Sequence, residues 1–310
     1  MTSFAGKTIL VTGASGFIGR ALMARLERES GVRLVVLSRQ GGSPARNCIW
    51  VKLPLEDLTR ESWKDHGVEH VDIVLHLAGF IPKRAADANS VDGAFRSNLT
   101  GTRMLLESLP SRPATFVIFS TIDVYAPVRS GCLTEASPVD PPSLYGASKF
   151  FCEKLVAAHA REHGYDHAIL RVGHTYGPGE DAYQKLIPQA IRALLEGKAP
   201  VIFGDGSVLR DFMYVDDVVE AAIRAASMRV SESLPINVVG GHPRPVRDVV
   251  DMLAEICGSL VPVEYRADMP GGRSLEFDNT RMHDTLGRWE QMPLWEGLVR
   301  EVEYFRRLHA

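Results

Sequence analysis

The sequence predicts an α/β fold, a doubly wound parallel sheet with a smaller mixed α/β lobe at the C-terminal side. Short apolar runs alternate with helical segments through the first half of the chain, as in a parallel sheet covered by helices on both faces. A turn with three glycines, residues 12–19, joins the first apolar run to the first helical segment. After residue 171 the pattern becomes irregular and richer in glycine and proline, and this change predicts the second lobe.

The first strand and helix enclose a turn of the kind that holds phosphates. Residues 7–11 have the composition of a buried strand, and an amphipathic helix follows from Phe17. Gly13 permits the sharp turn, Gly16 lets a pyrophosphate approach the backbone, and Gly19 lets helix and strand pack closely. The N–H groups and the positive end of the helix then face the phosphates. The turn therefore predicts nucleotide binding, with contacts from Gly13, Ser15, Gly16, Phe17, Ile18 and Gly19.

The rest of the sheet is predicted from four further apolar runs: 34–37, 71–77, 115–119 and 167–170. Such runs suit parallel strands that are buried on both faces. The predicted helices lie between them, at 22–28, 95–109 and 145–163. This alternation implies right-handed crossovers between parallel strands.

The chain is expected to return to the sheet after a first excursion into the smaller lobe. Segment 210–217, the helix that ends near Met228 and the strand 236–239 make this return. The sheet domain is therefore expected to span residues 1–170 plus about 208–245, and the smaller lobe about 171–207 plus 246–310.

Composition limits the classes of protein that fit. A chain of 310 residues with 45% hydrophobic content can bury a large core, and a net charge of −3 gives no basic footprint for nucleic acid. The four cysteines show no metal-type spacing or disulfide framework, which fits a reducing cytosol. The first strand begins by residue 7, so we expect no signal peptide, and no apolar run approaches the ~20 residues of a membrane helix. We therefore expect a cytoplasmic protein without membrane or nucleic-acid partners.

The stretch Tyr145-Gly-Ala-Ser-Lys149 places a phenol and an ammonium four residues apart. On a helix this spacing sets both groups on one face, one turn apart. An adjacent cation favours the phenolate form of a tyrosine and so equips it for acid–base work. A Tyr-x3-Lys pair arises often by chance, but together with the glycine turn it indicates catalysis.

The segment from Thr12 to Gly19, with Tyr145 and Lys149, resembles the short-chain dehydrogenase/reductase superfamily. The chain length and later motifs resemble its extended branch, the NAD(P)-dependent nucleotide-sugar epimerases, dehydratases and ketoreductases. The resemblance covers nearly the whole chain and implies a dinucleotide-binding Rossmann domain with a substrate-binding lobe. It further implies that Tyr145 moves a proton, while Lys149 activates this tyrosine and binds the nicotinamide ribose.

The resemblance extends to Thr121, which lies in the segment 120–125 after a predicted strand. In relatives this hydroxyl hydrogen-bonds the substrate oxygen beside the tyrosine, so Thr121 is expected to be catalytic and to contact substrate. Dehydratases of this branch carry Asp-Glu directly after the threonine, whereas this chain has Ile122 and Asp123. Isoleucine cannot transfer a proton, so dehydration is disfavoured, and Asp123 is kept as a substrate contact.

The cofactor is expected to be NADP, with NAD as the alternative. An acidic residue at the end of the second strand would favour NAD, but this chain has Ser38-Arg39, and a guanidinium suits a 2′-phosphate. The resemblance places Asp57-Leu58 beside the adenine, although Asp57 could equally cap the following helix. It also places the remaining cofactor contacts at Leu77, Ala78, Gly79 and Asn98.

The smaller lobe is expected to hold the substrate. His174 stands where many relatives have asparagine, and Arg210 matches the arginine that typically grips a nucleotide diphosphate. Lys185 and Arg273 could add charge to the same pocket. The segment 268–273 lacks the arginine that many relatives carry there.

The leading hypothesis is an oxidoreductase acting at C4 of a nucleotide-activated sugar, either a 4-ketoreductase or a 4-epimerase. A reductase of a non-nucleotide carbonyl compound and a non-catalytic nucleotide-sensing module are the alternatives. Family likeness suggests a homodimer formed through helices 95–109 and 145–163. No metal site is expected, since His159, His163 and His167 have no carboxylate or cysteine to complete a set.

Overall fold

The computed structural model describes residues 4–41, 47–127, 131–228, 234–269 and 272–309. The chain divides into two compact units. The first comprises Met1–Pro127, Pro138–Val172 and Val219–Ile236, and the second Val128–Ser137, Gly173–Val218 and Asn237–Ala310. Of the segment 208–245, which we expected beside the sheet, 208–218 and 237–245 belong to the second unit.

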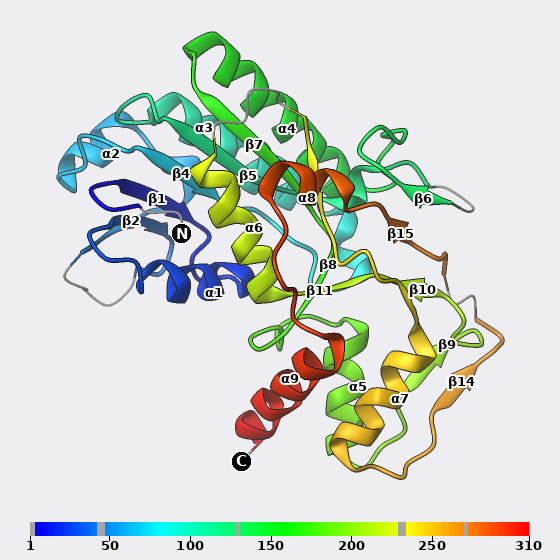
Figure 1. Ribbon diagram of the computed structural model, residues 1–310. Helices are drawn as coiled ribbons and strands as arrows, with labels where there is room; N and C mark the ends of the chain where they lie inside the picture. The colour runs from blue at the N-terminus through cyan, green and yellow to red at the C-terminus, as the bar shows by residue number, and fades with distance from the viewer. Residues whose placement is uncertain (1–3, 42–46, 128–130, 229–233, 270–271, 310) are drawn as a thin grey trace. The chain divides into compact units, whose positions relative to one another are not determined.

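The main sheet has seven strands in the order β12-β7-β5-β4-β1-β2-β3, and all of them except most of β12 belong to the first unit (Figure 1). The strands are β1 (Thr8–Thr12), β2 (Arg33–Ser38), β3 (Cys48–Lys52), β4 (Ile73–His76), β5 (Thr115–Thr121), β7 (Asp166–Val172) and β12 (Ile236–Val238). The pairings from β7 through to β3 are all parallel. Because the strand order runs outward in both directions from β1, the predicted doubly wound fold is confirmed.

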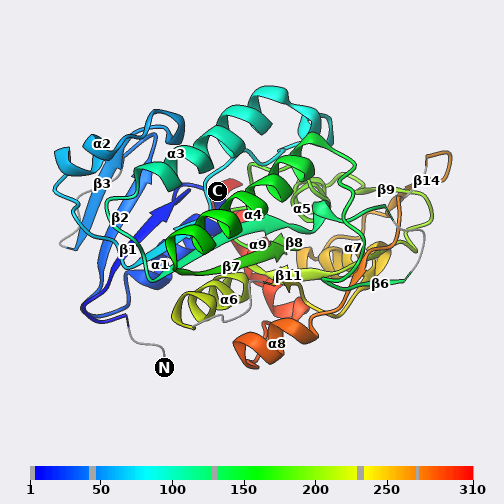
Figure 2. The same cartoon turned by 90° about the horizontal axis from the view of Figure 1, so that it is seen from above.

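Helices cover both faces of this sheet (Figures 1 and 2). The helical segments are α1 (Phe17–Leu26), η1 (Leu55–Asp57), α2 (Arg60–Asp65), η2 (Ala85–Asn89), η3 (Gly93–Thr100), α3 (Gly101–Ser108), η4 (Ile122–Val124), α4 (Leu144–His163) and α6 (Val215–Ser227). On one face of the sheet, strand residues such as Leu10, Val74 and Phe116 pack in one core with Leu105 of α3 and Val156 of α4. Every second residue of a strand points to this face. This period of two follows from the pleat of the strands.

The predicted helix 95–109 consists of two elements. Its first part is the π-helix η3, and only the second part, α3, is α-helical. Within η3 the carbonyl of Asn98 accepts a hydrogen bond from the Cys152 thiol at 3.3 Å. A π-helical turn at a functional position is a recurring feature of proteins, and apolar periodicity does not reveal it.

Helix α4 is fixed at both ends by local chemistry. The Ser143 side chain accepts a hydrogen bond from the Gly146 N–H at 3.1 Å, and Gly164 ends the helix with φ of +71°. This start makes Tyr145 the second residue of the helix. Helix α2 is capped by Thr59 rather than by Asp57, which lies within η1.

In its described residues, the second unit combines short two-stranded ladders with helices that include α5, α7, α8 and α9. Its elements are β6 (Cys132–Leu133), β8 (His174–Tyr176), α5 (Leu186–Leu195), β9 (Val201–Phe203), β10 (Leu209–Arg210), β11 (Phe212–Tyr214), β13 (Arg244–Pro245), α7 (Val246–Cys257), β14 (Glu264–Arg266), β15 (Glu276–Phe277), α8 (Thr280–Leu286) and α9 (Leu294–His309). The two-stranded ladders are β11–β8, β10–β13, β14–β9 and β15–β6. Helices α5, α7 and α9 pack against one another. Within the described residues, no helix has both the length and the hydropathy needed to cross a bilayer.

Candidate active site

The glycine turn between β1 and α1 has the geometry of a phosphate cradle. A Cβ at Gly13 would lie 2.6 Å from the backbone nitrogen of Ala78, and one at Gly19 would overlap the carbonyl oxygen of Gly13. At Gly16 a Cβ would meet that same oxygen at 3.3 Å and nothing else within 4 Å among the described residues. Gly13 and Gly19 are thus required by packing, while the side of Gly16 is open to a ligand.

The start of α1 faces this open side. The N-cap of the helix is Gly16, which provides no side-chain cap, so the positive end of the helix is available to an anion. Ser15 is exposed and its carbonyl accepts a hydrogen bond from Arg20 at 2.9 Å. Phe17 is buried beneath the turn and Ile18 is half-buried.

Thr121 and the first turn of α4 are brought together in the first unit. Thr121 ends β5 and its hydroxyl accepts a hydrogen bond from the Asp123 N–H at 3.2 Å. A Cβ at Gly146 would overlap the Asp123 carbonyl oxygen, so the helix start packs directly on the turn after Thr121. This contact places Tyr145 next to the same turn. Asp123 itself is exposed.

Lys149 lies one turn beyond Tyr145 and is 6% exposed. Its ammonium is near Gly79, since a Cβ on that glycine would be 4.0 Å from Lys149 Nζ. Burial lowers the pKa of Lys149, and the nearby Cys152 and Glu153 act in the opposite direction. A buried ammonium at this place is poised to act on a neighbouring phenol.

Asn98 links the loop after β4 to helix α4. Its side-chain oxygen accepts from the Phe80 N–H at 2.6 Å, and its amide donates to the Ser148 hydroxyl at 2.8 Å. Ser148 in turn donates to the carbonyl of Tyr145 at 2.8 Å. Asn98 is 1% exposed, so it holds the loop after Gly79 by satisfying backbone groups.

A buried histidine lies beneath the glycine turn, and sequence reasoning missed it. His76 ends β4, with Nδ1 2.8 Å from the Thr12 hydroxyl and Nε2 3.0 Å from the Thr102 hydroxyl. Thr12 also accepts a hydrogen bond from the Ala78 N–H at 3.1 Å. Burial, and secondly the charge of Lys149, lowers the pKa of His76 to about 3, so the ring is neutral.

The residues expected to read the adenosine lie in contrasting environments. Ser38 is buried at the end of β2 and accepts from the Gln40 N–H at 3.3 Å, whereas Arg39 is exposed. Asp57 is exposed within η1. Leu58 is fully buried in the core, so its side chain offers no surface to a ligand. The loop Leu77–Gly79 lies against Gly13.

The second unit contains a cavity of about 420 Å³, here called the nucleotide pocket. His174, Lys185 and Arg210 line it together with apolar side chains such as Ile202 and Phe203. Burial, followed by the charges of Arg210 and Lys185, lowers the pKa of His174 to about 3. The cavity thus offers cations beside an apolar wall, at a volume typical of small-ligand sites.

Charged side chains in this pocket are held by specific partners. Lys185 donates to the Glu180 carboxylate at 2.6 Å, and Glu180 is 1% exposed. Sequence reasoning missed Glu180, although it stands five residues before Lys185. The Arg210 guanidinium donates to the carbonyls of Leu209 and Arg273. The Arg273 side chain is exposed and does not line the pocket; residues 270 and 271 of its segment lie outside the described residues.

No group of three or more histidine, cysteine, aspartate or glutamate side chains suited to a metal ion occurs in the described part of the chain. His159 and His163 stack on each other at 3.9 Å between ring centroids, and His159 Nδ1 lies 2.7 Å from the Tyr165 hydroxyl. His159 and His163 therefore have partners within the protein.

The doubly wound sheet, the glycine turn and the buried tyrosine–lysine pair define an extended short-chain dehydrogenase/reductase. The chain belongs to the NAD dependent epimerase/dehydratase family, whose model matches residues 9–239. The resemblance drawn from the sequence is therefore confirmed. The cradle at Gly13, Gly16 and Gly19 fits the nicotinamide dinucleotide that this family implies.

Similar proteins carry several activities. A dTDP-glucose 4,6-dehydratase from Streptomyces griseus is 32% identical, with 96% of this chain and 94% of that protein covered. A UDP-glucose 4-epimerase from Thermotoga maritima, solved with UDP-glucose, is 30% identical with a TM-score of 0.85 over 98% of this chain and 100% of that chain. A UDP-glucuronic acid 4-epimerase from Bacillus cereus, solved with UDP-glucuronic acid and NAD, is 26% identical with a TM-score of 0.82 over 97% of this chain and 99% of that chain.

Proposed function

We propose that this protein transfers hydride at C4 of a nucleotide-activated sugar, and that it is a 4-epimerase. The observation that carries the proposal is the buried Lys149 ammonium, one turn beyond Tyr145 and beside the backbone of Gly79. That arrangement supports a tyrosine that exchanges a proton with a substrate hydroxyl. The UDP-sugar 4-epimerases among the similar structures support the choice of substrate and outcome.

Five side chains take part in the proposed reaction. Tyr145, as the phenolate that the Lys149 ammonium stabilises, accepts the proton of the C4 hydroxyl and later returns it. Thr121 donates a hydrogen bond that orients the substrate oxygen. A bound nicotinamide dinucleotide supplies the hydride acceptor. In the second unit, Arg210 and His174 bind the nucleotide diphosphate.

Dehydration is not proposed, although a dehydratase is among the similar proteins. Ile122 directly follows Thr121 and its side chain is buried, so no acid stands at that position. Elimination of water across C5 and C6 of a hexose needs both an acid and a base at the site. The single carboxylate of Asp123 does not provide this pair.

A second candidate is a 4-ketoreductase that uses NADP, and Ser38-Arg39 favours it. Arg39 is exposed at the end of β2, where a guanidinium could hold a 2′-phosphate. A reductase consumes the reduced cofactor, whereas an epimerase returns the hydride to the opposite face of the sugar. The departure at His174 leaves a non-nucleotide carbonyl substrate as a further alternative.

The decisive experiment follows product and cofactor together. We expect the protein, with catalytic NAD, to interconvert UDP-glucose and its C4 epimer without net change in reduced-nicotinamide absorbance. Steady loss of NADPH with a 4-keto sugar nucleotide would instead identify the reductase. Binding without turnover of any of these compounds would contradict the 4-epimerase and leave the sensing module or a reductase of a non-nucleotide carbonyl compound.

Tyr145→Phe tests the proton route. The variant should lose at least about 100-fold in kcat, since general acid–base catalysis contributes that much, and should still bind NAD. Tyr265→Phe is the matched control, because Tyr265 is an exposed residue of β14. Wild-type turnover in Tyr145→Phe would refute the proposed role.

A further inference from the structure

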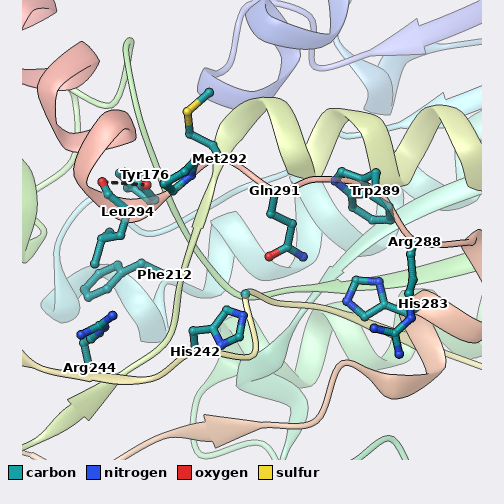
Figure 3. A pocket seen from close by; sticks show the side chains of 12 residues that line it. Tyr176, Phe212, His242, Arg244, His283, Arg288, Trp289, Gln291, Met292 and Leu294 are labelled. Atoms are coloured by element: carbon teal, nitrogen blue, oxygen red, sulfur yellow. Dashed lines mark hydrogen bonds between the residues drawn. The ribbon is translucent and has the colours of Figure 1, made fainter.

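A second cavity lies entirely within the second unit, separate from the nucleotide pocket, and has a volume of about 490 Å³. We call it the 242–291 pocket. The side chains that give it its character are His242, Arg244, His283, Arg288, Trp289 and Gln291 (Figure 3). They come from the segment before α7, from α8 and from the segment between α8 and α9.

The polar side chains of the 242–291 pocket are suited to an anion. Two arginines and two histidines line it, and none of its described lining residues is acidic. Two neighbouring carboxylates hold the walls, and the buried Oδ1 of Asp211 has no hydrogen-bond partner among the described residues. Asp217 accepts from the Trp289 indole N–H at 2.9 Å and from the Met292 N–H at 2.9 Å. Asp211 accepts from the Gly241 N–H at 2.9 Å.

Two buried polar atoms at this pocket lack a partner among the described residues. They are Nδ1 of His283 and the amide nitrogen Nε2 of Gln291. Figure 3 shows the Gln291 amide between the Phe212 side of the pocket and the Trp289–His283 side. Buried polar atoms are nearly always hydrogen-bonded, so these two nitrogens are candidates for contact with a bound water or ligand.

The charges around His283 are consistent with this interpretation. Burial lowers the pKa of His283, the charges of Arg288 and His242 lower it further, and Asp284 acts in the opposite direction. The charges around the His283 imidazole are therefore positive on balance. An anion bound among these groups would reverse the effect and raise the pKa of His283.

The remaining wall of the cavity is apolar and partly aromatic. Its side chains are Phe212, Leu294 and Trp289. The Trp289 indole lies edge-on to the His283 ring, with 5.8 Å between the ring centroids. The Tyr176 hydroxyl donates to the Leu294 carbonyl at 3.4 Å, which fixes the segment before α9. Flat aromatic surface beside cations suits a sugar or base that carries a charged group.

We propose that the 242–291 pocket binds a small phosphate monoester carried on a ring. A phosphate monoester has close to two negative charges and several acceptor oxygens, which matches two guanidinium groups and the donors of Gln291 and the histidines. A sugar phosphate and a nucleoside monophosphate share this chemistry. The proposal goes beyond the proposed function and does not depend on it.

This site is distinguishable from the nucleotide pocket. Arg210 lines the nucleotide pocket and Arg244 lines the 242–291 pocket, although the two residues are paired across β10 and β13. Phe212 and Tyr176 border both cavities. Variants of Arg210 and Arg244 therefore report on different sites.

The test is calorimetric titration of the full chain with glucose 1-phosphate, with adenosine monophosphate and with inorganic phosphate. We expect at least one ester to bind with a Kd below about 1 mM, and to bind more tightly than inorganic phosphate. The double variant Arg244→Gln/Arg288→Gln should weaken that binding by at least about tenfold, because it removes two guanidinium groups that can donate charge-assisted hydrogen bonds to the phosphate. Arg247→Gln, an exposed residue of α7 that does not line the cavity, is the matched control.

The outcomes decide between the sites and the ligand sources. Unchanged binding in Arg210→Gln together with loss in the double variant supports the proposal, and the tighter of the two esters identifies the source. Loss that follows Arg210→Gln instead, or no binding of any ester, overturns it. Because the double variant could fail to fold, the pKa of His283 is also measured by NMR in the wild-type protein. It should rise when the ester binds, and an unchanged pKa at saturation overturns the proposal.

Discussion

Glu153 and Arg171 form a buried, two-point ion pair within the first unit. Arg171 Nε lies 3.0 Å from one carboxylate oxygen of Glu153, and its second nitrogen lies 2.8 Å from the other. The Ser120 hydroxyl donates to the same carboxylate at 2.5 Å. Glu153 stands one turn beyond Lys149 on α4, and Ser120 precedes Thr121 on β5. The pair therefore links the helix and the strand that carry the candidate catalytic groups.

Glu153→Gln should affect both stability and the pH profile. It leaves the buried Arg171 without its counter-charge, which costs about 3–5 kcal/mol of unfolding free energy. It also removes a negative charge that raises the pKa of Lys149, so that pKa should fall. Since the proposed chemistry needs a charged Lys149, the alkaline loss of kcat should move to lower pH. Denaturant unfolding and a kcat–pH profile measure the two effects.

Glu162→Gln provides the control for this variant. Glu162 lies on the same helix but is exposed, so its loss should change neither quantity measurably. If Glu153→Gln lowers stability while the alkaline limb stays in place, Glu153 has only a structural role.

Arg39→Glu should weaken the binding of NADP relative to that of NAD. Replacing a guanidinium by a carboxylate repels a 2′-phosphate and offers an acceptor to a free ribose. The Kd for NADP should rise by at least about tenfold and that for NAD should change little or fall. Arg33→Glu, an exposed residue at the opposite end of β2, makes the same charge change away from the expected contact. Equal changes for both cofactors in Arg39→Glu would show that Arg39 does not read the phosphate.

The parts of the fold that the sequence predicted are those with strong local signals. The apolar run of β1, the glycine turn and the Tyr145–Lys149 spacing each lie within a few residues, so pattern and structure agree. Helix α5 was missed because its first turn contains Pro188 and its N-cap, Lys185, makes no side-chain cap. Edge strand β3 was implied before Asp57 but was given no range of its own, and its residues are mostly half-buried.

The parts of the site that could not be predicted depend on contacts between distant segments. Thr12 and His76 are 64 residues apart in the chain, and Glu153 and Arg171 are 18 residues apart. A single buried glutamate on a helix has no distinctive sequence pattern, because its partner is chosen by the fold. Leu58 was assigned to the adenine site from the family resemblance, and its side chain is fully buried in the core.

We expect the protein to be a dimer through η3 and α4. Phe95 and Phe151 are 58% and 54% exposed on these two packed elements, and an exposed apolar patch of this kind marks an interaction surface. Phe95→Glu/Phe151→Glu should halve the mass measured by light scattering, because charges cannot be buried at an apolar interface. Leu260→Glu makes the same type of change at a 99% exposed residue elsewhere and should leave the mass unaltered. A wild-type protein that is already monomeric would contradict this expectation.

Acid should destabilise the first unit through His76. Its pKa is about 3 in the folded protein against about 6.5 unfolded, so between these values the unfolded state binds more protons. The free energy of unfolding should therefore fall as pH decreases from about 7 toward 4.

His76→Asn removes this titration and should flatten the pH dependence of the denaturant midpoint, while His66→Asn, at a less buried site, should leave it steep. The pKa of the half-buried His174 of the second unit is lowered in the same direction, so adding His174→Asn to His76→Asn should reduce the remaining slope. An unchanged slope in the double variant would mean that carboxylates, not these histidines, control the acid stability.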